Sequence, residues 1–520
     1  MKSFISKSIS MCVLMLSVQF TIAQEYTLKQ VGRASLRNAG TIMDNNLVKG
    51  YFFFYENGRI DKKNSNFDIV VLNEELEEVE SKTIKEPKTT YLMESSYNGN
   101  TILFKFYDTK AKTVIYRTLG TDGKLSAKKT REANKYETVA YMNGIGKDLK
   151  NTNLSSVGDD LFIDIYSFKS KKFKYQVEGI GNDGAIDWTY TPEDRKGMTG
   201  GQLLASSKYT ILLLQSETKN QMSKDVSFYL IGLSKSGEEQ FTIELRNTKY
   251  NMLPINAVVN EDQSFTILGE YFDAGDKAMK SESEGLFAKT ISADGDEEGE
   301  TFLSWTKDIT PKVPSEHRRA MKQYSVYFHN IFLTNDGNIY AIGEQYKKQI
   351  SAAGVAFKAI AAASSNASSN VSAAEIQIAN MVMIKINPDM EVEKVEVWDK
   401  AHSNVMLPEG YGVVSKHLLA RILVAQGDFD YSYTQNDDEN SVYTVAYTDR
   451  EKVKGKLSKQ ALIRFVSFNE GDDDAVQDKM ELVTDADQMV VLPAKAGYVL
   501  VAEYSRKEKT ITLELTEFDY

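Results

Sequence analysis

The sequence predicts an all-β protein, a β-propeller of about eight four-stranded blades. The 28 tyrosines and 24 phenylalanines, against eight prolines, favour strands over helices or disorder. An apolar strand that ends in an aromatic residue before a polar turn recurs along the chain. Two further strands follow most copies and one precedes them, at a spacing of roughly 50–60 residues, which is typical of propeller blades. Seven blades, or two stacked β-sandwich domains, are the alternatives.

The repeated pattern is clearest between Tyr97 and Arg131. The expected strand 101–107 ends at a polar turn, and the next strand, 113–119, leads into Asp122-Gly123. This dipeptide suits a tight hairpin because glycine adopts positive φ without steric cost and aspartate tolerates it. The eight copies of the aromatic-ended strand are 51–55, 101–107, 161–166, 210–214, 265–271, 339–346, 442–447 and 498–504.

The two ends of the chain are expected to complete one blade together. The eighth repeat finishes with the strand 510–518 and lacks its outermost strand. Residues 25–31 supply a spare strand before the first repeat begins. Pairing of these two segments would close the last blade and remove an open sheet edge.

Residues 1–23 have the features of a secretory signal peptide. Lys2 and Lys7 form a basic start, residues 11–20 are largely apolar, and small residues lead up to Ala23. A short membrane anchor is the alternative, but the apolar stretch is shorter than the ~20 residues of a spanning helix. We therefore expect cleavage near Ala23, export to the periplasm or cell exterior, and one propeller domain over residues 24–520.

Composition restricts the partners that we expect. Cys12 is the only cysteine and lies in the signal, so no disulfide would stabilise the mature chain. Loss of Lys2 and Lys7 leaves 60 basic against 73 acidic side chains, a balance of −13. Such an acidic chain argues against nucleic acid and anionic lipid as partners. We expect a monomer without a membrane span that binds a protein or glycan of the cell envelope.

Two stretches interrupt the repeats. Residues 351–372 are rich in Ala and Ser and are predicted to form an inserted loop in the sixth repeat, either solvated or ordered by a partner. Residues 314–324 are predicted to form a helical turn between the fifth and sixth repeats. Their basic side chains are interpreted as a solvated loop, with an anion site as the alternative; they are His317, Arg318, Arg319 and Lys322.

No motif for catalysis or cofactor binding occurs, so we name no catalytic residue and no cofactor. Nucleophile elbows, phosphate-binding loops and dinucleotide fingerprints are missing. A zinc site would have to combine distant blades, because no ligand spacing relates the four histidines, His317, His329, His402 and His417. The acidic runs 294–299, 437–439 and 472–478 are interpreted as solvated turns, with calcium binding as the alternative.

The segment 26–55, YTLKQVGRASLRNAGTIMDNNLVKGYFFFY, resembles the start of an uncharacterised family of secreted, propeller-like proteins from Bacteroidota. The segment around Tyr97-Asn98-Gly99, with FKFYD shortly after it, is similar as well. The likeness extends along most of the chain. It implies export and a propeller-like body, and it brings no activity and no functional residues.

These observations favour an exported, non-enzymatic binding or scaffolding protein that presents propeller loops to a protein, peptide or glycan. Fold alone does not determine function, so two alternatives stay open. One is a carbohydrate-active hydrolase that uses carboxylates at the propeller channel, which a channel mouth lined by carboxylates and aromatic rings would favour. The other is a structural component of an envelope complex, which a broad exposed apolar patch would favour.

Overall fold

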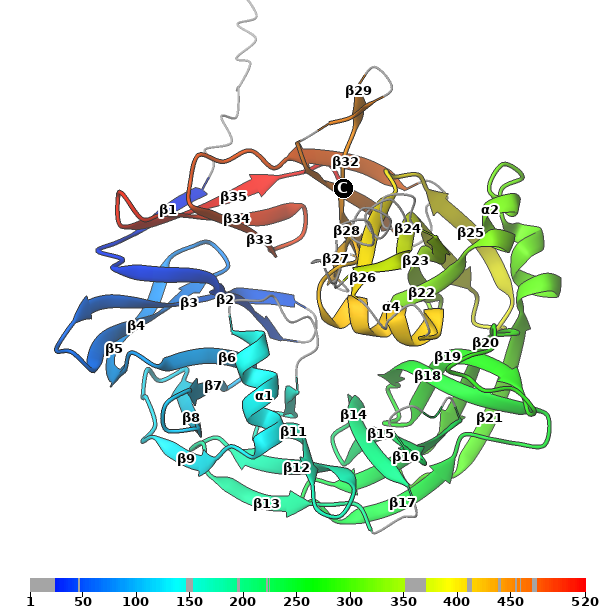
Figure 1. Cartoon of the computed structure of the whole chain (residues 1–520), viewed down its shortest axis with the longest axis horizontal. Coiled ribbons are helices and arrows are strands. Elements are labelled where there is room, and N and C mark those ends of the chain that lie inside the picture. Colours follow the sequence, from blue (N-terminus) through cyan, green and yellow to red (C-terminus); the bar gives the residue numbers. More distant parts are fainter. Residues whose placement is uncertain are drawn as a thin grey trace, which may run out of the picture.

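Eight antiparallel sheets lie in a ring around a central channel, which confirms the predicted eight-bladed propeller (Figure 1). The computed structural model describes residues 24–520 except for 45–46, 146–152, 194–196, 221–222, 224, 351–370, 409–413, 438–440, 454–455, 459 and 470–474. The expected signal peptide therefore lies outside the described residues. In each blade the first strand given below is nearest the channel.

Blade 1 contains β2 (Arg33–Asp44), β3 (Leu47–Arg59), β4 (Asn64–Asn73) and β5 (Glu78–Pro87). Blade 2 contains β6 (Thr90–Tyr97), β7 (Thr101–Asp108), β8 (Thr113–Gly120) and β9 (Lys129–Glu132). Blade 3 contains β10 (Leu154–Val157), β11 (Leu161–Lys169), β12 (Phe173–Gly181) and β13 (Ile186–Tyr190). Blade 4 contains β14 (Met198–Ser206), β15 (Thr210–Thr218), β16 (Val226–Ser234) and β17 (Glu239–Glu244).

Blade 5 contains β18 (Tyr250–Val259), β19 (Phe265–Asp273), β20 (Gly285–Ile291) and β21 (Glu297–Ser304). Blade 6 contains β22 (Ser325–Leu333), β23 (Ile339–Ile350), β24 (Val371–Ile386) and β25 (Val392–Trp398), with β26 (Ser403–Pro408) added beside β24. Blade 7 contains β27 (Tyr431–Asp437), β28 (Val442–Asp449), β31 (Leu462–Asn469) and β32 (Val476–Glu481), with the hairpin β29 (Lys452–Val453) and β30 (Lys456–Leu457) inserted. Blade 8 contains β33 (Gln488–Pro493), β34 (Tyr498–Ser505), β35 (Thr510–Glu517) and β1 (Gln24–Lys29).

The N-terminal strand closes the ring as predicted. β1 pairs antiparallel with β35 from Gln24 opposite Leu515 to Lys29 opposite Thr510. Leu28 is 4% exposed and belongs to an apolar cluster that also contains Leu513 of blade 8 and Tyr51 of blade 1. The pairing therefore removes a sheet edge and stabilises the junction of the first and last blades.

Neighbouring blades pack through alternating apolar side chains. Phe52 and Phe54 of β3 meet Phe104 and Phe106 of β7, with ring centroids 5.4 Å apart for Phe52 and Phe104 and 5.1 Å for Phe54 and Phe106. Because side chains alternate between the two faces of a strand, each sheet offers an apolar face to both neighbours. The ring geometry follows from this repeated sheet-on-sheet packing.

A buried ionic network also joins blades 2 and 3. The fully buried Lys105 of β7 lies 2.7 Å from Asp164 of β11, which also accepts a 2.6 Å hydrogen bond from the Tyr116 hydroxyl. Arg131 of β9 lies 2.7 Å from Glu137 of helix α1 (Lys135–Gly144). The network therefore fixes α1 as well as the two sheets.

The short helices and the long strands of blade 6 correct the sequence-based picture in part. Helix α2 (Arg318–Gln323) confirms the expected helical turn, and it follows the turns η1 (Trp305–Ile309) and η2 (Thr310–Lys312). α1 and α4 (Lys416–Ala425) were not predicted. β24 starts at Val371 instead of the expected residue 381, and residues 351–370 of the expected loop lie outside the described part.

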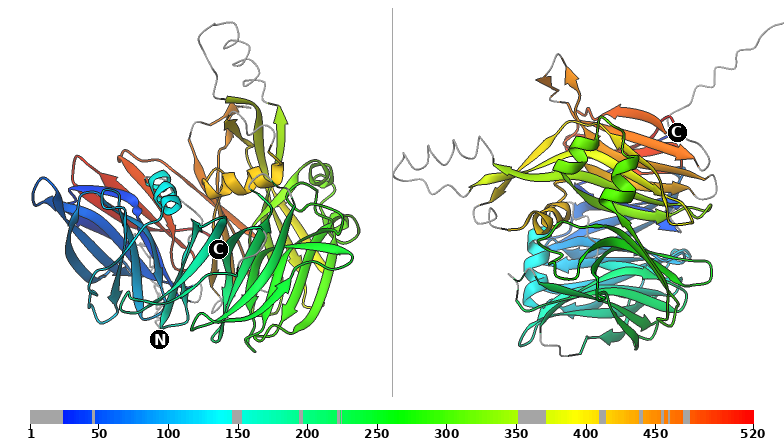
Figure 2. Two further views of the ribbon diagram at one scale, coloured as in Figure 1. Left: turned by 60° about the horizontal axis from the view of Figure 1, so that its bottom comes forward. Right: turned by 90° about the vertical axis from the view of Figure 1, so that its right-hand side faces the viewer.

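One face of the ring carries α1, α4 and the extension of blade 6 formed by β23, β24 and β26 (Figure 2). α4 buries Leu419, Ala420, Leu423 and Val424 in one cluster with Ile376 of the extension. This apolar stripe at helical spacing holds α4 beside the channel. None of the helices that the structure describes is long and apolar enough to cross a membrane.

Leu28→Ala tests the closure of the ring. Loss of this buried side chain leaves a cavity between β1 and β35, so we expect a decrease of about 3 kcal/mol in the free energy of unfolding. Lys29→Ala, at an exposed position of the same strand, is the control and should change little. Urea unfolding of both variants measures the difference. Equal stability of the two variants would contradict a structural role for this strand.

Candidate functional site

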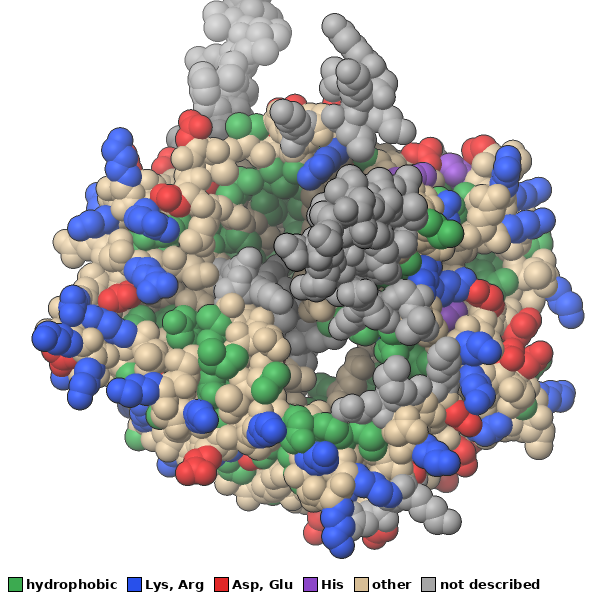
Figure 3. Space-filling model, viewed as in Figure 1, with side chains coloured by type: hydrophobic (Ala, Val, Ile, Leu, Met, Phe, Trp, Pro, Cys, Tyr) green, Lys and Arg blue, Asp and Glu red, His purple; other side chains and the backbone are tan. Residues whose placement is uncertain are grey.

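A cavity of about 490 Å³ opens where the innermost strands of blades 4 to 7 converge on the channel. Its wall consists of residues from β14, β18, β22 and β27, with Glu270 of β19, Tyr346 of β23 and three residues of α4. The volume is in the usual range of small-ligand sites. Figure 3 shows the hollow centre of this face, bordered by hydrophobic side chains, with lysines and arginines spread around the outer rim.

Bulges in the innermost strands supply part of this wall. The strands β6, β14, β18, β22 and β27 each contain one residue that has no partner across the ladder. In blades 5, 6 and 7 the unpaired residues are Ile255, His329 and Ser432, and all three line the cavity. A bulge bends the strand and redirects side chains. The repeated bulge therefore brings residues from three blades to one site.

Glycines stand opposite two of these bulges. Gly269 pairs with Pro254, and Gly343 pairs with Phe328, directly beside the unpaired residue in each strand. A Cβ atom at Gly269 would lie 2.2 Å from the carbonyl oxygen of Leu253, so the bent strand leaves no room for a side chain. Each glycine precedes a glutamate, Glu270 or Glu344.

Glu344 lies behind the cavity wall in a buried ionic network. Its carboxylate is 2.9 Å from Lys400 and 3.1 Å from Nε2 of His329, and Lys400 also contacts Asp430. Despite burial, Lys400 and His329 lower the pKa of Glu344 to about 2. The His329 ring stacks on Tyr431 with centroids 4.6 Å apart and an interplanar angle of 7°. The network thus holds two flat rings in the wall.

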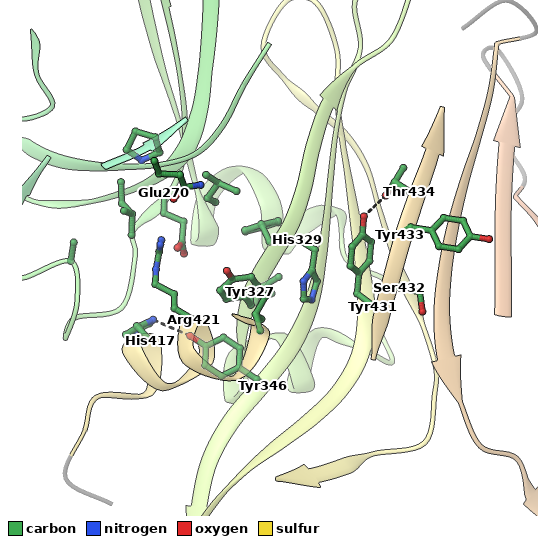
Figure 4. A pocket seen from close by; sticks show the side chains of 18 residues that line it. Glu270, Tyr327, His329, Tyr346, His417, Arg421, Tyr431, Ser432, Tyr433 and Thr434 are labelled. Atoms are coloured by element: carbon green, nitrogen blue, oxygen red, sulfur yellow. Dashed lines mark hydrogen bonds between the residues drawn. The ribbon is translucent and has the colours of Figure 1, made fainter. Parts of the chain in front are cut away.

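Glu270 and Arg421 are two ionisable side chains that face each other inside the cavity (Figure 4). Arg421 extends from α4 toward Glu270, whereas Tyr433 points to the other side of β27. Glu270 accepts a 2.7 Å hydrogen bond from the Ser283 hydroxyl. Burial raises the pKa of Glu270, and Arg421 opposes this rise. The guanidinium of Arg421 has no hydrogen bond or ion pair with any residue that the structure describes.

Polar contacts fix the start of α4 above the cavity. The Ser415 hydroxyl donates to the carbonyl of Met279, and Lys416 pairs with Glu282. Nδ1 of His417 is 3.0 Å from the Tyr346 hydroxyl. Burial lowers the pKa of His417 to about 4, so this imidazole is neutral at pH 7. The helix is therefore anchored to blades 5 and 6.

The structure brings together two of the four histidines, His329 and His417, whereas His317 and His402 lie elsewhere. Within the described ranges, no group of three or more possible ligands could hold a metal ion. The acidic run 294–299 forms the β20–β21 turn with mostly exposed side chains. Residues 438–439 and 472–474 of the other two runs lie outside the described part. The repeated Gly-Glu pair at 269–270 and 343–344 was the available sequence signal for the site.

Residues 5–519 match a family described as a family of unknown function, DUF6770. The chain belongs to this family. Membership agrees with the resemblance to an uncharacterised propeller family, since the fold is now shown. A search of curated proteins found no match.

Solved structures with low similarity include other propellers. The WD40 domain of SCAP from fission yeast aligns with a TM-score of 0.39 and 9% identity, over 95% of this chain and 98% of that chain. A prolyl endopeptidase aligns with a TM-score of 0.41 and 9% identity, over 92% of this chain and 56% of that chain. The propeller domain of the Trilobed protease from Pyrococcus furiosus aligns with a TM-score of 0.33 and 10% identity, over 70% of this chain and 96% of that chain. These similarities carry no inference about function.

Gly269→Ala tests the bent inner strand. The added Cβ would collide with the Leu253 backbone, so we expect a decrease of about 1–3 kcal/mol in the free energy of unfolding. Gly275→Ala is the matched control, because a Cβ there meets nothing within 4 Å. Thermal or urea unfolding compares the two. A Gly269→Ala variant as stable as its control would show that the strand does not approach so closely.

His417 predicts a specific pH dependence. Its folded pKa of about 4 lies below the ordinary 6.5, so the unfolded chain binds more protons in this window and the folded state loses stability as pH falls from 6.5 to 4. His417→Gln removes this contribution, so the stability difference between wild type and variant should shrink with falling pH. His402→Gln, at an exposed position, is the control. A pH-independent difference in urea unfolding would contradict the burial of a neutral imidazole.

Proposed function

We propose that this chain is a non-enzymatic binding protein that holds a ligand, a glycan or a peptide segment, in the channel cavity. The supporting observation is the convergence of bulged strands from blades 5, 6 and 7 on one cavity with aromatic walls. Cavities of this size, lined by aromatic side chains and a few polar groups, are the usual sites of small ligands in proteins.

The distribution of carboxylates makes hydrolysis the weaker alternative. Glycoside hydrolysis ordinarily uses two carboxyl groups on either side of the scissile bond. Among the described residues of the cavity wall, Glu270 is the one carboxylate. Glu344 is fully buried behind His329 and is held by Lys400. The cavity therefore suits recognition better than acid and base catalysis by paired carboxylates.

Aromatic side chains favour a ligand with flat apolar faces and polar edges. Tyr327 lies 5.1 Å from His329 between ring centroids, and His329 stacks on Tyr431. Tyrosine combines apolar surface with a hydroxyl group that can form hydrogen bonds. Sugar rings present the same combination of apolar faces and hydroxyl groups. Export, and hence a glycan or peptide of the cell envelope as ligand, is part of the proposal.

Binding assays with Tyr327→Ala test this proposal. A glycan array and a peptide library, screened with wild-type protein, should give a ligand whose affinity falls by about tenfold or more in the variant, since aromatic anchors carry much of the binding energy. Tyr209→Ala is the control, because Tyr209 is 57% exposed and does not line the cavity. Tyr327→Phe should restore most of the affinity if the ring itself is the contact. A ligand that binds both alanine variants like wild type would place recognition outside the cavity.

A further inference from the structure

We propose that the ligand of the channel cavity is an acidic glycan, and that Arg421 binds the carboxylate of one of its sugar units. This inference rests on the proposed function and names the chemical class of its ligand. Three features carry it: the guanidinium in the cavity, the position of Glu270, and the aromatic wall on the other side.

Arg421 presents unused hydrogen-bond donors to the cavity. The residue lies in the middle of α4 and lines the cavity, and its side chain is half-buried. A guanidinium carries five N–H donors in a planar fork and stays charged at every physiological pH. In the part of the chain that the structure describes, none of these donors has a hydrogen-bond partner. These donors are accessible from the cavity, so a ligand that enters it can take them up.

Glu270 is near Arg421 but does not take up these donors. It accepts its hydrogen bond from Ser283, and no ion pair joins it to Arg421. Burial raises the pKa of this carboxyl, which eases its protonation when a second anion enters. His417, on the same helix, and Tyr346 and Tyr327, on the strands packed against it, are neutral at pH 7. Arg421 is the one lysine or arginine among the described residues that line the cavity, and the His329 imidazole is held by Glu344.

The chemistry of this wall selects a carboxylate and a sugar. A guanidinium fork matches the two oxygens of a carboxylate and forms two parallel hydrogen bonds with it. On the other side, the rings of Tyr327 and Tyr431 line the cavity and give flat apolar surface for a pyranose face. The His329 ring, whose side chain is 3% exposed, packs against both and supports them from behind. The hydroxyl groups next to a uronate carboxylate can bond to Glu270 and to tyrosine hydroxyls. A peptide terminus also supplies a carboxylate, but it lacks the ring hydroxyl groups that would bond to Glu270.

Isothermal titration calorimetry with matched probes tests the inference. Trigalacturonic acid should bind wild-type protein, and its methyl ester, which lacks the charges, should bind about tenfold or more weakly. Arg421→Gln should weaken the affinity for trigalacturonic acid by a similar factor, and the variant should bind the acid and the ester equally well. Glu270→Gln removes the competing carboxyl group, so it should bind the acid as well as wild type or better. Arg319→Gln, an exposed arginine of α2 outside the cavity, is the control and should behave like wild type.

The outcomes separate this inference from the proposed function. Equal binding of acid and ester by wild type, or unchanged acid binding by Arg421→Gln, would overturn the role of Arg421. Two outcomes would overturn the acidic glycan and keep the cavity as the binding site. One is a neutral ligand whose binding depends on Tyr327. The other is a peptide that binds through its free carboxyl terminus and no longer binds when that terminus is amidated. Failure of trigalacturonic acid to bind wild type would count against the inference as well. If no ligand is found whose binding weakens in Tyr327→Ala, the proposed function itself is overturned.

Discussion

The pairing of β1 with β35 is the constraint on which the rest of the molecule depends. A single propeller blade is not stable by itself, because both apolar faces of its sheet must pack against a neighbouring sheet. The ring supplies those neighbours, and the outermost strand of its last blade comes from the other end of the chain and packs against blade 1. Closure also sets the positions of the innermost strands. The channel, and the cavity between blades 4 and 7, are consequences of it.

Departures from the repeat build the site inside this regular frame. A single unpaired residue in an inner strand redirects the wall of one blade, and glycine on the next strand makes room for the bend. The ion pair of Glu344 and Lys400 keeps the rings of His329 and Tyr431 in place. α4 then adds Arg421 from outside the repeat.

The repeat, the number of blades and the closure could be predicted because each depends on patterns that recur along the chain. Alternation of apolar residues and Asp-Gly turns is local information, and eight copies reinforce it. The site could not be derived in this way. One added residue shifts the alternation of an inner strand by one position, and nothing in the sequence tells this shift from an ordinary irregularity. α4 is a short helix whose apolar stripe is recognisable as an interface only beside Ile376 of the blade 6 extension. His329 and His417 are 88 residues apart in sequence, and their common cavity follows from the packing of α4 on blade 6.

The most direct measurement of the central claim, recognition in the channel cavity, is a crystal structure of the protein with trigalacturonic acid. The account predicts the sugar between α4 and the inner strands of blades 5 to 7, with a carboxylate on Arg421 and a ring face on Tyr327 or Tyr431. Sugar bound on the opposite face of the ring or along the blade edges, with Arg421 still without a partner, would contradict it.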